Sequence, residues 1–200
     1  SADAPSDAGE HDAGVSLAPW PSTLPSSAAL GERRGFALAR AIVHVHSPLS
    51  HDACDGEGWV DGSLADRPCL DHFRAAACAL HIDAMMVTDH APHLNEVPFE
   101  SGLWIEGDDE PISDAEGNTV ASRMACPDGH RVLMTVGSEN ELMPLGLERP
   151  PGDPGDVAAL ETLYDGATPA SIAAFREAGA LEWQAHTEGQ SPDALRARDL

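Results

Sequence analysis

The sequence predicts an α/β fold with a parallel layer or barrel, because short apolar strands alternate with helical segments along most of the chain. A second observation supports this interpretation, since four of the predicted strands run into histidine or acidic residues. Parallel strands place their carboxyl ends at one edge of a sheet, so these polar residues should gather there. The four strand ends read HVHSPLSHD, TDH, GSE and AHTE, beginning at residues 44, 88, 137 and 185.

Composition excludes several classes of partner. The chain has 200 residues, which suits one domain, and its 34 acidic against 11 basic residues give a formal charge of −23. Such a charge argues against nucleic acids and anionic membrane surfaces as partners. No apolar run approaches the roughly 20 residues of a membrane-spanning helix. We therefore expect no membrane insertion and a small-molecule substrate.

The first 30 residues differ from the rest of the chain. They are rich in Ala, Ser, Asp, Pro and Gly, so they predict a flexible spacer, with residues 31–200 forming the domain. Such a spacer is typical of an exported bacterial protein, periplasmic or at the cell surface. Ordinary terminal disorder and a cytoplasmic location are also compatible with it.

The four cysteines contain no C-x-x-C pair, so they do not predict a zinc ribbon. In an exported protein, Cys54 and Cys69 are the first pair expected to form a disulfide. Four free thiols are the alternative.

Residues 41–53 carry the main functional signal. Their β-branched residues alternate with His44 and His46, so the segment predicts a strand with both imidazoles on one face. Two nitrogen ligands at a strand end suit a metal such as zinc, and Asp52 follows closely enough to add a carboxylate. The alternative is a pair of buried core histidines.

The next segment should extend this site. Apolar residues spaced by three and four predict an amphipathic helix over residues 70–81, and a short apolar run predicts a buried strand over residues 82–87. With the first strand they should form a right-handed parallel β-loop-α-β unit. That unit places Asp89 and His90 beside the first two histidines.

Later segments predict further elements. Residues 91–129 are polar and predict no long element, so they are interpreted as a binding loop or lid, or as a surface insertion. A third buried strand is predicted at residues 131–136, and Glu139 follows it as a candidate bridging ligand. The expected order beyond is an apolar continuation, two helices, a fourth strand delivering His186 and a final helix, at residues 142–147, 157–164, 169–178, 181–185 and 192–198.

The four strand-end motifs resemble those of the polymerase-and-histidinol-phosphatase (PHP) superfamily of metal-dependent hydrolases, in order and approximate spacing. The resemblance runs from residue 41 to residue 187. Its most specific parts are the His-x-His motif followed by Asp52, and Asp89-His90 after a buried strand. The loop that carries Asp52 is similar to that of exported members related to carbaryl-type esterases. The resemblance implies a distorted (β/α)7 barrel with two or three metal ions at its strand ends.

The resemblance also implies roles for individual residues. The first two histidines would share one metal, the glutamate would bridge it to a second, and the loop aspartate would share a third with His90. Asp89 and His90 would be catalytic, Asp89 by orienting a ligand or receiving a proton. The implied ions are divalent zinc, manganese or iron. Six residues would hold them: His44, His46, Asp52, His90, Glu139 and His186.

The chain departs from the family pattern in two places. The family closes its site with a late Asp-x-His, and no such motif follows His186. The fullest ligand set also has a histidine between the positions of Glu139 and His186, which this chain lacks. We therefore expect a barrel truncated after the strand that carries His186, whose unpaired edge would favour oligomerisation.

The expected function is metal-dependent hydrolysis with a metal-activated water, and the leading substrate class is a small phosphorylated molecule. Hydrolysis of a carboxyl ester or amide at the same site is the second hypothesis. A non-catalytic remnant that binds a metal or another ligand is the third. No G-x-S-x-G, P-loop or G-x-G-x-x-G motif is present, so serine hydrolases, P-loop nucleotidases and dinucleotide enzymes lack a signature.

Overall fold

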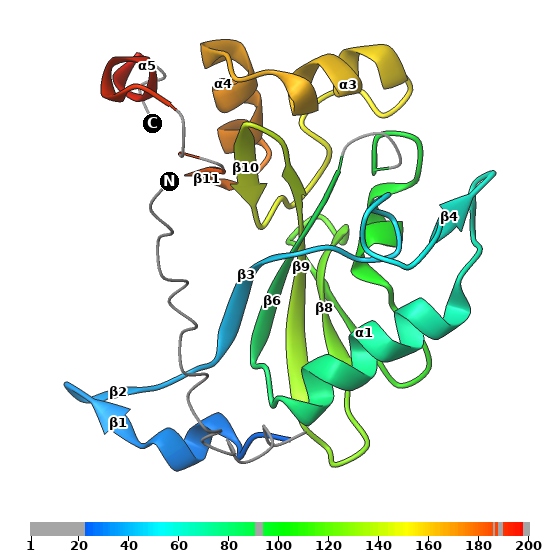
Figure 1. The fold of residues 1–200 in the computed structure, drawn as a ribbon, viewed down its shortest axis with the longest axis vertical. Coiled ribbons are helices and arrows are strands. Elements are labelled where there is room, and N and C mark those ends of the chain that lie inside the picture. The colour runs from blue at the N-terminus through cyan, green and yellow to red at the C-terminus, as the bar shows by residue number, and fades with distance from the viewer. Residues whose placement is uncertain (1–22, 91–93, 186, 188–189, 198–200) are drawn as a thin grey trace, which may run out of the picture.

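The computed structural model describes residues 23–90, 94–185, 187 and 190–197, and its centre is a five-stranded mixed sheet (Figure 1). The first three strands across this sheet are parallel, whereas the fourth is antiparallel to the third and the fifth to the fourth. Their order is β3 (Ala41–Val45), β6 (Ala84–His90), β9 (Arg131–Glu139), β8 (Thr119–Ala125) and β7 (Glu110–Ser113).

The helix of the predicted β-loop-α-β unit covers one face of this sheet. α1 (Arg67–Ala79) begins where the Asp66 side chain accepts a hydrogen bond from the Cys69 amide at 3.0 Å. The helix buries Leu70 and Ala77 in a core shared with apolar residues of β6 and β9. Beyond it, β6 pairs with β3 in parallel, as the sequence predicts, so both strands end at the same edge.

A second group of elements lies beside the carboxyl ends of the parallel strands (Figure 1). β10 (Leu142–Leu145) pairs antiparallel with β11 (Leu181–Gln184). The predicted helices α3 (Val157–Asp165) and α4 (Pro169–Glu177) contribute to a second apolar core centred on the fully buried Phe175. This core also receives apolar side chains from β9 and β10, so it joins the helices to the central sheet.

The remaining elements are short. Residues 1–22 of the predicted spacer lie outside the described residues, but the last part of that segment contacts the domain. Ser27 is buried, and its hydroxyl donates a hydrogen bond to Asp83 at 2.9 Å. The short elements are η1 (Ser27–Leu30), β1 (Glu32–Arg33), β2 (Phe36–Ala37), β4 (Trp59–Val60), β5 (Ser63–Leu64), η2 (Phe99–Leu103) and α5 (Pro192–Arg196).

The predicted (β/α)7 barrel is wrong, because the sheet is open and mixed. Within the described residues, only β3, β6 and β9 form parallel pairs, and only one helix connects two of them. The chain reaches β9 from β6 through the antiparallel strands β7 and β8. The strand expected to continue the parallel layer is β11, which pairs antiparallel with β10 in a separate two-stranded sheet.

The prediction for residues 91–129 also needs correction. Its C-terminal part is neither a lid nor a surface insertion, because β7 and β8 belong to the central sheet. Ser122 and Met124 on β8 are completely buried. A backbone hydrogen bond between Asp114 and Asn118 closes the turn between β7 and β8, and one between Cys126 and His130 closes the next turn.

All four cysteines are paired. The predicted bond between Cys54 and Cys69 is present, and a second bond joins Cys78 to Cys126. Two disulfides are typical of a protein that folds in an oxidising compartment. Among the described helices, none combines the length and the apolar composition that crossing a membrane requires.

Glu182 on β11 supplies a pH-dependent prediction. Its carboxylate oxygens are shielded from solvent and have no hydrogen-bond partner among the described residues. Burial raises the pKa of Glu182 to about 7 from 4.5, against the opposing effect of Arg176. Because the folded-state pKa is the higher one, protonated Glu182 favours folding below pH 4.5, and this contribution is lost as the pH rises through about 7.

We therefore expect Glu182→Gln to be more stable than the parent at about pH 8, by about 1 kcal/mol, and equally stable at about pH 4. Urea denaturation at the two pH values measures the difference. Glu161→Gln, on the exposed side of α3, is the matched control and should change stability at neither pH. Equal stability of Glu182→Gln and the parent at the higher pH would contradict the prediction.

Candidate metal centre

The end of β3 positions the two histidines of the first motif. His44 lies on β3 and His46 follows one residue after the strand, so both side chains leave the same face. Their Nε2 atoms are 3.2 Å apart, which confirms the predicted common face. The pairing of β3 with β6 shifts register between Ile42 and Val45, an irregularity of the kind that re-aims side chains near sites.

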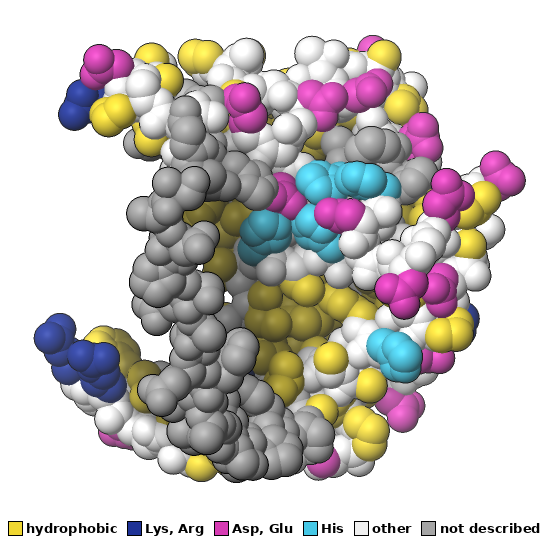
Figure 2. Space-filling model, in the orientation of Figure 1, with side chains coloured by type: hydrophobic (Ala, Val, Ile, Leu, Met, Phe, Trp, Pro, Cys, Tyr) yellow, Lys and Arg dark blue, Asp and Glu magenta, His cyan; other side chains and the backbone are white. Residues whose placement is uncertain are grey.

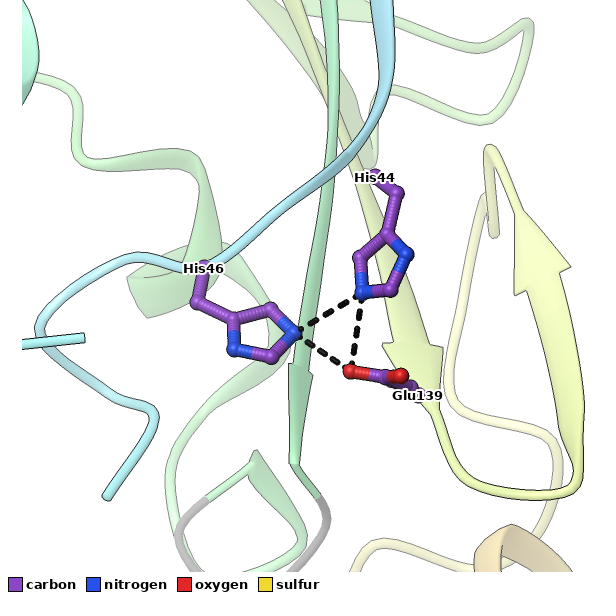
Figure 3. A group of neighbouring side chains, drawn as sticks. All are labelled: His44, His46 and Glu139. Atoms are coloured by element: carbon purple, nitrogen blue, oxygen red, sulfur yellow. Dashed lines mark hydrogen bonds and ion pairs between the residues drawn. The ribbon is translucent and has the colours of Figure 1, made fainter. Parts of the chain in front are cut away.

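The carboxylate of Glu139 meets these histidines from the end of β9. In the parallel pairing of β6 with β9, His90 lies directly opposite Glu139, so these two strands end together, and β3 ends nearby, opposite Val87 of β6. Glu139 is only 4% exposed. Its Oε2 atom lies 2.9 Å from His44 Nε2 and 2.6 Å from His46 Nε2, and the three side chains point toward one another (Figure 3).

These three donor atoms fit a divalent ion. Imidazole nitrogen and carboxylate oxygen suit zinc, manganese and iron. The ligand atoms of a tetrahedral zinc lie about 3.3 Å apart, because each is about 2.0 Å from the metal. The observed separations of 2.6, 2.9 and 3.2 Å therefore need shifts of less than an ångström to admit an ion. The buried Glu139 carboxylate would also compensate part of the ion's charge.

A second group shares His46 and adds Asp52 and His90. His46 Nδ1 faces Asp52 Oδ1 at 2.8 Å, and His90 Nε2 lies 3.5 Å from Asp52 Oδ2 and 3.6 Å from Glu139 Oε2. Burial raises the pKa of Asp52, but hydrogen bonds from Ser50 and His46 and the charges of His46 and His90 outweigh it, so the pKa falls below its usual range. Asp52 is therefore ionised and available as a ligand.

The shared histidine limits how the two groups can be used. When its Nδ1–H donates to Asp52, the ring presents the unprotonated Nε2 toward His44 and Glu139, which is the tautomer that a metal on that side requires. The same ring does not serve two ions at once unless both nitrogens lose their protons. Asp52 thus orients His46 in this arrangement, and it can contribute to a second ion only with His90 and Glu139.

A set of hydrogen bonds fixes the loop that follows β3. The buried carboxylate of Asp89 accepts hydrogen bonds from the Ser47 amide and the Ser47 hydroxyl, each at 2.6 Å. Burial raises the pKa of Asp89 to about 6, against the lowering effect of those hydrogen bonds. Both carboxylate oxygens accept hydrogen bonds from Ser47, so Asp89, on β6, fixes the start of the loop that follows β3. Asp89 directly precedes the predicted ligand His90 in the sequence.

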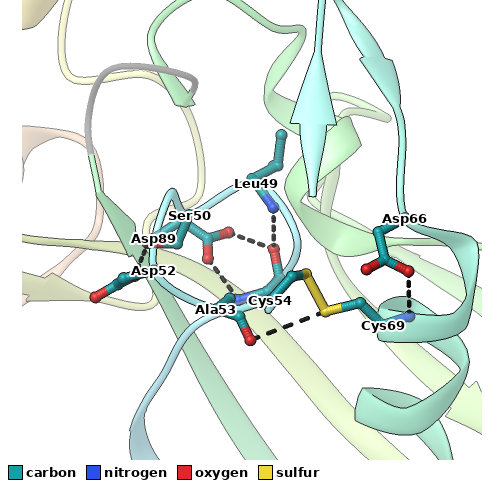
Figure 4. The surroundings of a disulfide bond; sticks show 9 residues. Leu49, Ser50, Asp52, Ala53, Cys54, Asp66, Cys69 and Asp89 are labelled. Carbon is teal, nitrogen blue, oxygen red and sulfur yellow. Dashed lines mark hydrogen bonds between the residues drawn. A yellow bond between two sulfur atoms is a disulfide. The ribbon is translucent and has the colours of Figure 1, made fainter. Parts of the chain in front are cut away.

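The disulfide fixes the other end of this loop. Cys54 is bonded to Cys69 in the first turn of α1, close to Asp66 (Figure 4). Asp66 and the two sulfur atoms lie within 4.8 Å of one another, but the sulfurs are consumed by the disulfide and are not thiolate ligands. The loop carrying Asp52 is therefore held between Asp89 and α1.

The structure brings together five of the six predicted metal ligands. His186 lies outside the described residues, so its predicted role stays a prediction. Sequence reasoning missed Ser47 and Ser50, whose hydroxyls organise the site. Ser50 donates to Asp52 Oδ1 at 2.7 Å and accepts from the His90 amide at 3.3 Å. The only available signal was their place in the polar segment directly after a strand. The five ligands are His44, His46, Asp52, His90 and Glu139.

The surroundings of the site are acidic. Histidine and acidic side chains gather over the ends of the parallel strands (Figure 2). The sequence has no lysine. Arg40, which directly precedes β3, binds the carbonyls of Leu80 and His81 at the other end of the sheet.

Asp52→Ala should weaken zinc binding by the His44, His46 and Glu139 group about 10- to 100-fold, because His46 loses the acceptor that fixes its tautomer. Competition with a chromophoric zinc chelator measures this affinity. Glu57→Ala removes the same charge from an exposed position of the same loop and is the control. If both variants bind zinc as the parent does, Asp52 does not orient His46.

Comparison with known proteins adds no family assignment. No family model, curated protein or solved structure matches the chain. The case for the metal centre therefore rests on the positions of its side chains.

Proposed function

We propose that the chain is a metal-dependent hydrolase related to the PHP superfamily. The observation that carries this proposal is the convergence of donor atoms from His44, His46 and Glu139, with Asp52 and His90 beside them. These residues come from β3, β6, β9 and one loop, so the proposal does not require a closed barrel. Two disulfides and the predicted spacer support a location outside the cytoplasm, in the periplasm or at the cell surface.

Each ligand would have a defined task. His44, His46 and Glu139 would hold one ion, and Asp52 and His90 would hold a second that Glu139 bridges to the first. When bound, a divalent ion lowers the pKa of a water molecule and stabilises the negative charge that develops on a carbonyl or phosphoryl oxygen. Asp89 keeps the ligand loop in place through Ser47, and Glu139 supplies a buried carboxylate.

Two substrate classes follow from this site. A small phosphorylated substrate is the class that the family resemblance predicts. A carboxyl ester or amide is favoured by the charge of the chain, because 34 acidic residues outnumber 11 arginines and the sequence has no lysine to balance a phosphate. The strongly acidic chain should also repel anionic substrates.

Elemental analysis of the purified chain, together with hydrolysis of p-nitrophenyl phosphate and p-nitrophenyl acetate, tests the proposal. We expect two equivalents of zinc, manganese or iron, and hydrolysis that a chelator abolishes and added metal restores. His46→Ala should lose the first ion, because it removes one of the three ligands of that ion. Bound metal without hydrolysis of either ester would support the non-catalytic metal-binding alternative instead.

A further inference from the structure

A pocket adjoins the candidate metal centre. Its volume is about 460 Å³, and it lies between the loop after β3 and the first turns of α1. The Cys54–Cys69 disulfide and Phe73 form part of its lining. Figure 2 shows a hollow with hydrophobic side chains directly beside the gathered histidines. A cavity of this size accepts a small organic group.

His46 connects this pocket to the metal centre, because it lines the pocket and also belongs to both ligand groups. A substrate whose scissile bond lies at the ligand atoms could therefore extend one substituent into the pocket. A larger cavity of about 520 Å³, between residues 94–100 and α3, includes none of the five described ligands. The pocket beside His46 is thus the better place for part of a substrate.

The charge of the lining restricts what this substituent can be. Asp55 and Asp66 line the pocket, and no arginine does. The nearest basic residue in the sequence, Arg67, is turned away, since its guanidinium binds Asp71 at 2.7 Å and Glu106 at 2.7 Å. Phe73 offers an aromatic surface, which attracts an ammonium group as well as an apolar one.

We propose that this pocket binds the leaving group of a carboxyl ester and that the leaving group is a positively charged amino alcohol. The proposal rests on the hydrolase function proposed above and names its substrate class. In the reaction, the oxygen of a water molecule bonds to the acyl carbon, and the bond between that carbon and the ester oxygen breaks. The departing alcohol takes one proton of that water, and the carboxylic acid product releases the other.

Two esters of the same shape test the charge preference directly. Acetylcholine and 3,3-dimethylbutyl acetate differ only in the quaternary nitrogen, which is a carbon atom in the second ester. At about pH 8, where imidazoles are usually neutral, we expect kcat/KM about 10-fold higher for acetylcholine. Equal values for the two esters would overturn the proposal, while hydrolysis of both would still support the hydrolase function.

Variants that remove the two carboxylate charges of the pocket test whether the preference for acetylcholine arises there. Asp55→Asn combined with Asp66→Asn should reduce the acetylcholine preference about 3- to 5-fold, and asparagine remains a good helix cap at position 66. The control combines Asp61→Asn with Glu161→Gln, which removes two charges from exposed positions outside the pocket. An equal loss of preference in the control would show that the net charge acts, and not the pocket.

A binding experiment separates this proposal from the hydrolase function. Choline and 3,3-dimethylbutan-1-ol are titrated into the protein, and the NMR signals of the His72 ring, which also lines the pocket, are followed. Shifts with choline that exceed those with the neutral alcohol, and that Asp55→Asn with Asp66→Asn reduces, support the pocket even if no ester is hydrolysed. Absence of a choline-dependent shift would overturn it.

Discussion

Glu139→Gln should empty the metal centre, whereas Glu141→Gln should leave it intact. Glu139 is buried and its Oε2 atom contacts His44 and His46 within 2.9 Å. Glutamine keeps the shape but removes the charge that offsets two cations, so more than one ion should be lost. Glu141 follows the end of β9, is exposed, and belongs to neither ligand group.

Metal content and hydrolysis measured in parallel decide this prediction. We expect less than about one tenth of the parent's hydrolysis in Glu139→Gln and parental values in Glu141→Gln. Because both variants change the same type of residue two positions apart, a general effect of lost charge would appear in both. Equal behaviour of the two would reject Glu139 as the bridging ligand, and a selective loss in Glu141→Gln would move that role to Glu141.

Removing the two disulfides should have different consequences. The bond between Cys78 and Cys126 closes 48 residues and ties the end of α1 to the end of β8, and the bond between Cys54 and Cys69 closes 15. Chain-entropy arguments give about 4 and about 3 kcal/mol of stability for loops of these lengths. Asp52 lies outside both closed loops but only two residues before Cys54, so only the loss of the Cys54–Cys69 bond should also weaken metal binding.

Paired Cys→Ser variants allow both effects to be measured on each bond. Urea denaturation of Cys78→Ser/Cys126→Ser should show the larger fall in stability with the zinc affinity of its folded form unchanged. Cys54→Ser/Cys69→Ser should show the smaller fall with weaker zinc binding. If both pairs weakened zinc binding equally, the disulfide beside the ligand loop would have no particular role in positioning Asp52.

The parallel half of the sheet and most of the candidate site could be predicted from the sequence. β-branched residues alternating with His44 and His46 identify a strand and a common face, and a helix between two strands predicts their parallel pairing. Parallel pairing then brings their ends together without any knowledge of the side-chain packing. The parallel pairing of β6 with β9 likewise brings His90 opposite Glu139.

The antiparallel half could not be predicted in this way. β8 buries Ala121, Ser122 and Met124 where a typical strand would bury larger β-branched residues, so its sequence resembles a polar loop. The Ser122 hydroxyl is satisfied by the Leu103 carbonyl at 3.2 Å, a contact between distant segments that local sequence does not show. The direction of β11 could likewise not be predicted, because the residue pattern of a strand carries no information on its direction. That direction is set by the antiparallel pairing with β10.

Local sequence could also not reveal several contacts between distant segments. The contact between Asp89 and Ser47 joins residues 42 positions apart, and the bond between Cys78 and Cys126 joins residues 48 apart. Cysteine positions limit the possible pairings but do not select one. These contacts depend on the assembled sheet, so they emerge only from the structure.

The position of β3 at the edge of the described sheet gives the metal centre a mechanical role. β3 has five residues and pairs with β6 alone, so few backbone hydrogen bonds keep it from fraying. An ion held by His44 on β3 and by Glu139 on β9 would act as a clamp across the intervening strand. A metal ion that binds only the folded chain would then slow the hydrogen exchange of the β3 amides more than that of other amides. Exchange at β3 would therefore reveal metal binding even where the free energy of global unfolding changes little.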